Sequence, residues 1–372
     1  MTSNRRRSSA IMFAQDALPQ IRSQRIAASI IPFVGAGFSC NISHLMDFEL
    51  FLRTSASALL RRKGTLTKGD LYDAFDGDAP RALEYLCLKL GQRGRTSARS
   101  TSASETGHKI FEERVKAYII QCGLNGITDR NASQWKQHIK LVEKFTKTIY
   151  TTNWDRSIEY AAEHLRRTNK RTCHKTLVAV PGSDGPAHTS PHGQHRSSTD
   201  TVTIYKYHGD IGLDGTLLAT EADFYSRLFK PCDIDRDLSA WLQQNALLYI
   251  GYSIADVNLR YTLTQIARFK KNMDRQTPMS YLVDLLPFES YCAPFNEYLR
   301  DVLGVQPVYL FDPQSMDGKC IESWTAKLND IRRTLKCADT NSRARCLRRY
   351  KALLRRRKPL VQKHIVEFLQ DI

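Results

Sequence analysis

Continuous apolar runs alternate with amphipathic stretches along most of the chain, and this pattern indicates the fold class. A run rich in β-branched residues at 29–34 ends abruptly in Gly35-Ala36-Gly37, as a buried strand does where it enters a tight turn. Such runs are typical of parallel strands covered on both faces. We therefore expect an α/β protein with a doubly wound, Rossmann-like parallel sheet. Further strands are predicted at 147–152, 176–180, 202–208, 247–251, 279–285 and 307–311, and helices at 155–168, 236–245, 255–271 and 288–303.

The stretch between the first two predicted strands has a different pattern. After position 45, apolar residues recur at three- and four-residue steps, which indicates an amphipathic helix, and further helices are predicted at 69–90 and 108–121. Ser, Arg and Gly residues without apolar periodicity at 91–105 indicate a mobile loop. We therefore interpret residues 45–147 as a helical insertion, or cap, over the glycine turn.

Basic segments lie near both ends of the sequence, and the formal net charge is +17. Residues 1–28 are interpreted as a basic arm followed by a helix, and residues 313–372 as a basic helical segment. Within the latter, leucines and Tyr350 recur among the arginines of 343–358, as in a basic amphipathic helix. Such a helix can bind the phosphates of a nucleic acid, pack on an acidic partner or present a solvated face, and the sequence leaves these readings open.

The distribution of cysteine and histidine gives little sign of a metal. The nine cysteines include no C-x-x-C pair, which argues against a zinc ribbon or disulfide framework and fits a cytoplasmic compartment. His188, His192 and His195 lie among glycines and prolines, where a surface loop is favoured over a metal site. We expect no bound metal. The sequence contains no run of 18 apolar residues, so we expect no membrane-spanning helix.

Polar side chains follow several predicted strands at the points where they end. Thr152-Asn153-Trp154-Asp155, His208-Gly209-Asp210 and Gly251-Tyr252-Ser253 each come at such a point. In an open α/β sheet, ligands bind beyond the carboxyl ends of the strands. Taken singly, each motif has a plainer explanation: a helix cap, a hydrogen-bonded core histidine, or an ordinary turn.

The ordered set Gly-Ala-Gly-x-Ser, Thr-x-Asn-x-Asp, Lys-x-His-Gly-Asp and Gly-Tyr-Ser resembles the motifs of the sirtuin superfamily, specifically its bacterial SIR2-like branch, over residues 29–260. The resemblance implies that Asn153 orders the nicotinamide ribose and the attacking water, and that His208 is the general base. It implies an NAD⁺-binding catalytic domain at 29–312. The residues it implies for NAD⁺ binding are Gly35, Ala36, Gly37, Phe38, Ser39, Asp47, Thr152, Asp155, Gly251, Tyr252 and Ser253.

Two departures from the zinc-containing sirtuins bear on the activity. Those deacylases carry two C-x-x-C pairs after the His-Gly motif, and this chain has neither, so we expect no zinc lobe. At Asp47, Met46 stands where relatives carry proline, which weakens that assignment. The chain resembles instead the non-zinc SIR2-like proteins, many of which cleave NAD⁺ as effectors of anti-phage defence.

The resemblance therefore implies an NAD⁺ glycohydrolase that takes NAD⁺ as substrate and releases ADP-ribose and nicotinamide. It also implies a homo-oligomer with a separately encoded regulator, such as a HerA-type ATPase or a short Argonaute module. One alternative is an NAD-dependent protein deacylase or ADP-ribosyltransferase. The other is a non-enzymatic subunit that binds NAD⁺, ADP-ribose or nucleic acid.

Overall fold

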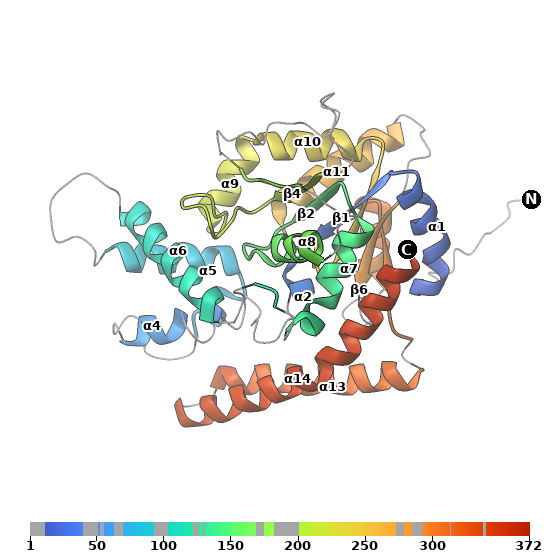
Figure 1. Ribbon diagram of the computed structural model, residues 1–372. Coiled ribbons are helices and arrows are strands. Elements are labelled where there is room, and N and C mark those ends of the chain that lie inside the picture. Colours follow the sequence, from blue (N-terminus) through green and yellow to red (C-terminus); the bar gives the residue numbers. More distant parts are fainter. Residues whose placement is uncertain are drawn as a thin grey trace, which may run out of the picture.

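The computed structural model describes most of the chain, and Figure 1 shows its arrangement. Among the described residues, no helix combines the length and apolarity needed to cross a membrane. The described residues are 12–39, 51–52, 56–62, 70–92, 103–121, 126–128, 131–168, 175–181, 201–272, 279–284, 293–312, 314–337 and 340–372.

A seven-stranded parallel sheet in the order β3-β4-β2-β1-β5-β6-β7 forms the centre of the molecule, which confirms the predicted fold class. The middle strand β1 and its neighbour β5 are buried along their whole length, in line with their uninterrupted apolar sequences. The strands are β1 (Ile30–Val34), β2 (Thr148–Thr151), β3 (Lys175–Ala179), β4 (Thr201–Lys206), β5 (Ala246–Ile250), β6 (Ser280–Asp284) and β7 (Val305–Tyr309).

Helices cover both faces of the sheet, and alternate residues of each strand pack against different layers. In β1, Ile30 and Val34 belong to one core cluster, while Ile31 and Phe33 belong to the other. The first cluster includes α1 (Ala14–Ile26), η3 (Ala132–Trp135), α7 (Lys136–Lys144), α8 (Ser157–Thr168), α13 (Met316–Cys337) and α14 (Thr340–Asp371). The second includes α10 (Asp233–Leu242), α11 (Val257–Asn272), α12 (Ala293–Glu297) and the π-helical turn η4 (Tyr298–Val302).

Another group of helices forms a separate layer beside the sheet, on the left of Figure 1. This cap consists of α4 (Ser57–Arg62), η2 (Asp73–Phe75), α5 (Ala79–Gly91) and α6 (Ala103–Gln121), and has its own apolar core. It joins α9 (Glu221–Phe229) through polar contacts: Arg81 pairs with Glu221 at 3.0 Å and His108 with Asp223 at 3.0 Å. The described elements between residues 45 and 147 are thus helices, but α7 lies on the sheet with α8 and α14 rather than in the cap.

One predicted helix is wrong at its beginning. We expected a helix over 69–90, whereas the structure has a turn at Asp76 and Gly77 and starts α5 at Ala79. The side chain of Asp78 accepts a hydrogen bond from the Arg81 amide, and Pro80 occupies the first turn. Both features favour a helix start at this point, because they satisfy or remove amide donors that have no partner inside the helix.

The direction in which successive strands are added to the sheet reverses at β1. After β1 the chain builds one half of the sheet, and it returns at β5 on the other side of β1. The loops after β1 and β5 meet there: the Gly35 amide donates to Ile250 O at 3.0 Å, and the Gly37 amide donates to Gly251 O at 2.8 Å. Such a reversal point is where open α/β sheets bind ligands.

Glycine is required where these loops meet. Gly251 has a φ of +63°, and a Cβ on it would lie 2.1 Å from the amide nitrogen of Phe38. A Cβ on Gly35 would lie 2.5 Å from Gly251 O. The need for glycine in this turn is therefore explained by contact between two segments of backbone.

Replacing Gly251 by alanine is expected to lower the free energy of unfolding by at least ~2 kcal/mol more than Gly215→Ala does. Gly215 is the matched control, because its φ is +75° but an added Cβ would meet no atom within 4 Å. Only the cost of the left-handed backbone, about 1 kcal/mol, is expected there. Urea denaturation of the two variants measures the difference, and equal losses would contradict a close contact between the loops.

Candidate functional site

The four sequence motifs meet at the carboxyl edge of the sheet, because β1, β2, β4 and β5 are neighbouring parallel strands. The Thr152 amide donates to Val34 O, and the Tyr207 amide donates to Thr151 O. These bonds extend the sheet beyond its strands and hold the segments that follow β1, β2 and β4 together. The structure therefore brings Ser39, Asn153, His208 and Gly251 into one region, as the sequence predicted.

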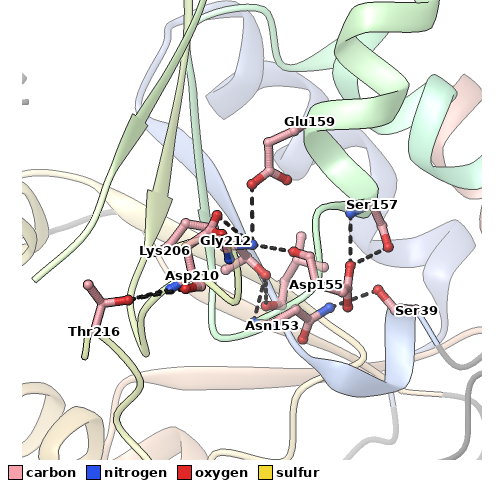
Figure 2. A network of polar contacts seen from close by, with 11 residues as sticks. Ser39, Asn153, Asp155, Ser157, Glu159, Lys206, Asp210, Gly212 and Thr216 are labelled. Atoms are coloured by element: carbon pink, nitrogen blue, oxygen red, sulfur yellow. Dashed lines mark hydrogen bonds and ion pairs between the residues drawn. The ribbon is translucent and has the colours of Figure 1, made fainter. Parts of the chain in front are cut away.

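Asn153 is fixed from two sides. Its backbone amide donates to Thr151 Oγ1 at 3.0 Å. Its side-chain Nδ2 donates to Ser39 Oγ at 2.8 Å (Figure 2). Its Oδ1 is buried and has no hydrogen-bond partner among the described residues. The bond to Ser39 joins the asparagine of one motif to the serine of another, and leaves Oδ1 as an acceptor for a ligand.

Asp155 organises the start of α8. Its Oδ1 accepts hydrogen bonds from the amide of Ser157, at 2.9 Å, and from the Ser157 hydroxyl (Figure 2). This is the geometry of a helix cap, the plainer of the two explanations for the Thr-x-Asn-x-Asp motif. The backbone oxygen of Asp155 accepts a hydrogen bond from Lys206 Nζ.

Lys206 lies at the centre of a buried charge network (Figure 2). Its side chain is 0% exposed, and its Nζ lies 3.3 Å from Glu159 Oε1 and 3.7 Å from Asp210 Oδ2. Burial raises the pKa of Glu159, and the positive charge of Lys206 opposes that rise. The lysine connects β4 with α8 and with the loop at Asp210. It therefore positions the backbone that follows Asn153 and the backbone that follows His208. The motif Lys-x-His-Gly-Asp contained this lysine, but no role was predicted for it.

A second buried ion pair, between α9 and α10, contacts the chain just after β4. Arg227 donates to both oxygens of Asp235 at 2.8 Å, and also to Tyr207 O, directly before His208. Its guanidinium lies 4.0 Å from the centre of the Tyr207 ring. Burial raises the pKa of Asp235, but the hydrogen bonds and charge of Arg227 outweigh it, and the net pKa lies below its usual value.

His208 forms a pair with an acid that sequence reasoning did not assign. Its Nε2 lies 2.6 Å from Asp256 Oδ2, and both side chains are largely buried. Asp256 also accepts from the amides of Asn258 and Leu259 at the start of α11. Burial raises the pKa of Asp256, but the hydrogen bonds and charge of His208 and the two amide bonds outweigh this effect. The net pKa lies below its usual value, so the carboxylate is ionised at neutral pH. A polar residue just after Gly-Tyr-Ser, at the start of a predicted helix, was the available signal.

Two adjoining cavities meet at Ala36, Thr152 and His208. The larger is a cleft of about 1080 Å³ that includes Gly37 and the segment from Gly251 to Ser253. The smaller is a chamber of about 280 Å³ between the site and the cap. The chamber is mostly apolar. Its lining includes Ser39, Phe51, Val115, Tyr118, Asn153, Trp154, Asp155 and Phe224.

The predicted NAD⁺-binding residues are divided between these surfaces and the protein interior. Ala36, Gly37, Thr152, Gly251, Tyr252 and Ser253 line the cleft, whereas Ser39 and Asp155 line only the chamber. Gly35 contacts the Gly251 loop, and Phe38 is 0% exposed with its ring against His138. Gly35 and Phe38 thus support the site from behind. Asp47 lies outside the described residues.

The C-terminal helices form the far wall of the cleft, which no sequence pattern indicated. Leu328 and Asn329 of α13 line it, together with Arg357, Lys358 and Val361 of α14. In Figure 1, these helices run along the lower side of the molecule, and α14 then turns up toward the sheet. Part of the basic segment is therefore close to the site.

No cluster of three or more metal-ligating side chains occurs within the described ranges. His188, His192 and His195, the one histidine group considered for a metal, lie outside those ranges. Where the structure describes the chain, the polar groups of the site include an amide, an imidazole with its paired carboxylate, and the hydroxyl of Ser39. This set suits hydrogen bonding and proton transfer to an organic substrate.

His138 lies beneath the glycine loop and is fully buried. Burial lowers its pKa to about 4, although the negative charge of Asp155 opposes the shift. The unfolded chain binds a proton at this residue below pH ~6.5, whereas the folded protein does not until about pH 4. Acid therefore favours unfolding within this window.

The free energy of unfolding is expected to fall by up to ~3 kcal/mol between pH ~6.5 and pH ~4 through His138 alone. His138→Gln removes the titrating group, so its stability should depend less steeply on pH across the same window. Urea denaturation of both proteins at several pH values checks this expectation. Parallel curves of stability against pH would contradict a buried, neutral His138.

The chain has no match among the curated proteins. Residues 147–298 match the model of the SIR2-like domain, and this segment contains Asn153, His208 and Asp256, while the glycine loop precedes it. SIR2-like domains bind NAD⁺, so the match is consistent with an NAD-related activity at this site. The match supports placing this part of the chain in the SIR2-like superfamily.

Proposed function

We propose that the chain is an NAD⁺ glycohydrolase, which cleaves NAD⁺ to ADP-ribose and nicotinamide. The observation that carries the proposal is the position of Asn153 and the His208–Asp256 pair where the cleft and the apolar chamber meet. If the leaving group of a long substrate enters the chamber while the rest of the substrate lies in the cleft, the bond to be broken lies at this junction. The SIR2-like match supports NAD⁺ as the substrate class.

The chemistry requires little acid catalysis. Nicotinamide leaves NAD⁺ as a neutral molecule, while positive charge develops on the ribose. The protein has to hold the ribose, keep the leaving group from returning and orient a nucleophile. The apolar chamber separates the departing base from bulk water, and the acceptor Oδ1 of Asn153 can hold a water molecule by one of its hydrogens.

His208 supplies the base. Because its Nε2 is bound to Asp256, Nδ1 is the nitrogen that remains to accept a proton from water or from a ribose hydroxyl. Asp256 keeps this tautomer and stabilises the imidazolium that forms on proton transfer, as the carboxylate of a catalytic triad does. The start of α11 in turn holds Asp256 in place.

We further propose that the protein acts as a defence effector that depletes NAD⁺, as the sequence resemblance implies. A hydrolase of this kind is harmful when unregulated, which favours control by homo-oligomer formation or by a separate partner such as a HerA-type ATPase. The basic segment of α14 is a candidate contact for such a partner or for a nucleic acid. Its supporting feature is the run of arginines between residues 343 and 358.

Asn153→Ala and His208→Ala are each expected to lower the rate of nicotinamide release from NAD⁺ by about 10²–10⁴-fold. Chromatography of nicotinamide and ADP-ribose measures the rate for the full-length chain, both purified and in expressing cells. His164→Ala, on α8, is the matched control and should act like wild type. If wild type never exceeds the Asn153→Ala/His208→Ala double variant in either setting, the proposal fails. Release only with an acylated peptide supports the deacylase alternative instead.

Asp256→Asn is expected to lower kcat by about 10²-fold or more, while the melting temperature changes little. The asparagine Oδ1 can still cap α11, but its charge is lost and its amide no longer selects the required histidine tautomer. Asp312→Asn is the matched control, because Asp312 Oδ1 accepts an amide hydrogen bond from Gln314 outside the site. An Asp256→Asn enzyme with wild-type kcat would contradict the role of the pair.

A further inference from the structure

The helix α7 supports the glycine loop from inside the protein. Gln137 Nε2 donates to Phe38 O, and the His138 ring packs 4.6 Å from the Phe38 ring and 5.8 Å from the Trp135 ring, measured between centroids. Both side chains are 0% exposed. The sequence offered no signal for them, since they lie more than 95 positions from the loop that they contact.

His138 and Asn153 converge on one hydroxyl group. His138 Nε2 lies 3.4 Å from Ser39 Oγ, and Asn153 Nδ2 donates to the same oxygen at 2.8 Å. His138 Nδ1 is buried and has no hydrogen-bond partner among the described residues. The state of Ser39 therefore depends on which nitrogen of His138 carries the hydrogen.

The tautomer follows from the cost of burying an unpaired donor. His138 is neutral at physiological pH, because burial lowers its pKa to about 4. A hydrogen on Nδ1 would be an N–H donor without an acceptor, which folded proteins rarely tolerate. A hydrogen on Nε2 has Ser39 Oγ as its acceptor and leaves only an unfilled lone pair on Nδ1. The second tautomer is the favourable one.

This tautomer determines where the Ser39 hydroxyl hydrogen points. A serine hydroxyl accepts two hydrogen bonds and donates one. Here Asn153 Nδ2 and His138 Nε2 fill both lone pairs, so the hydroxyl hydrogen is left for a third direction. Ser39 lines the chamber, together with Asn153 and His208.

We propose that His138 is a positioning residue: by donating to Ser39 Oγ, it directs the Ser39 hydroxyl hydrogen at an oxygen of the substrate in the chamber and keeps Asn153 Oδ1 facing the same space. The substrate oxygen belongs to the nicotinamide riboside half of NAD⁺, which carries both hydroxyl and carboxamide oxygens. The identity of the substrate rests on the proposed function, whereas the orientation of the hydroxyl does not.

Kinetics of three variants test the proposal. His138→Phe keeps an aromatic ring but removes the donor, and should lower kcat about tenfold with KM changed less than about threefold. His138→Gln keeps an N–H donor that can reach Ser39 and should retain kcat within about threefold of wild type. In a Ser39→Ala background, His138→Phe should cause little further loss, because His138 acts through Ser39.

Val142→Ala is the control for packing, since Val142 is a buried residue of the same helix. It should lower stability but leave kcat as in wild type. A purely structural role of His138 predicts equal loss in His138→Phe and His138→Gln, or an undiminished loss in the Ser39→Ala background. Either result, or wild-type kcat in His138→Phe, overturns the proposal.

A second measurement does not depend on catalysis. In protein labelled with ¹⁵N-histidine, the His138 resonances, assigned by their absence in His138→Gln, should show a neutral ring with its hydrogen on Nε2. A hydrogen on Nδ1 overturns the proposal. If wild type releases no nicotinamide, the proposed function fails, and this spectrum still decides the orientation of His138 and Ser39.

Discussion

The contact between the loops after β1 and β5 is the constraint on which the site depends. The backbones at Gly35, Gly37 and Gly251 approach so closely that a single Cβ would collide with main-chain atoms. The loops are hydrogen-bonded to each other, and each also lines a cavity where ligands can enter. Because β1 and β5 are also neighbours in the sheet, this contact brings the motifs of both halves to one space beyond the ends of the strands.

Buried charges position the segments that follow β2 and β4. Lys206 joins Asp155, Glu159 and Asp210, and Arg227 joins Tyr207 to Asp235. A buried charge without a partner is costly, so separating the partners in either network would be strongly destabilising. Asn153 and His208 lie directly beside the two networks. The hydrogen-bonding groups of the site are therefore held by ion pairs whose charged side chains line neither cavity.

Much of the shape of the site comes from parts of the chain outside the matched SIR2-like segment. The cap helices enclose the apolar chamber together with α9 of the matched segment, while α13 and α14 form the far wall of the cleft. α7 lies beneath the glycine loop and supplies His138. The matched segment supplies most of the reactive groups, and the rest of the chain determines which space surrounds them.

The sequence by itself determined the sheet and the edge where the site lies. Seven apolar runs became seven strands, and parallel strands place their carboxyl ends together, so polar motifs at those ends had to meet. Local pattern could not reveal the pairing of His208 with Asp256, the burial of Lys206 or the bond between His138 and Ser39. Each joins residues four or more positions apart whose partners are selected only when helices pack on the sheet. Tertiary structure decided these contacts, because only burial determines which polar groups must find one another.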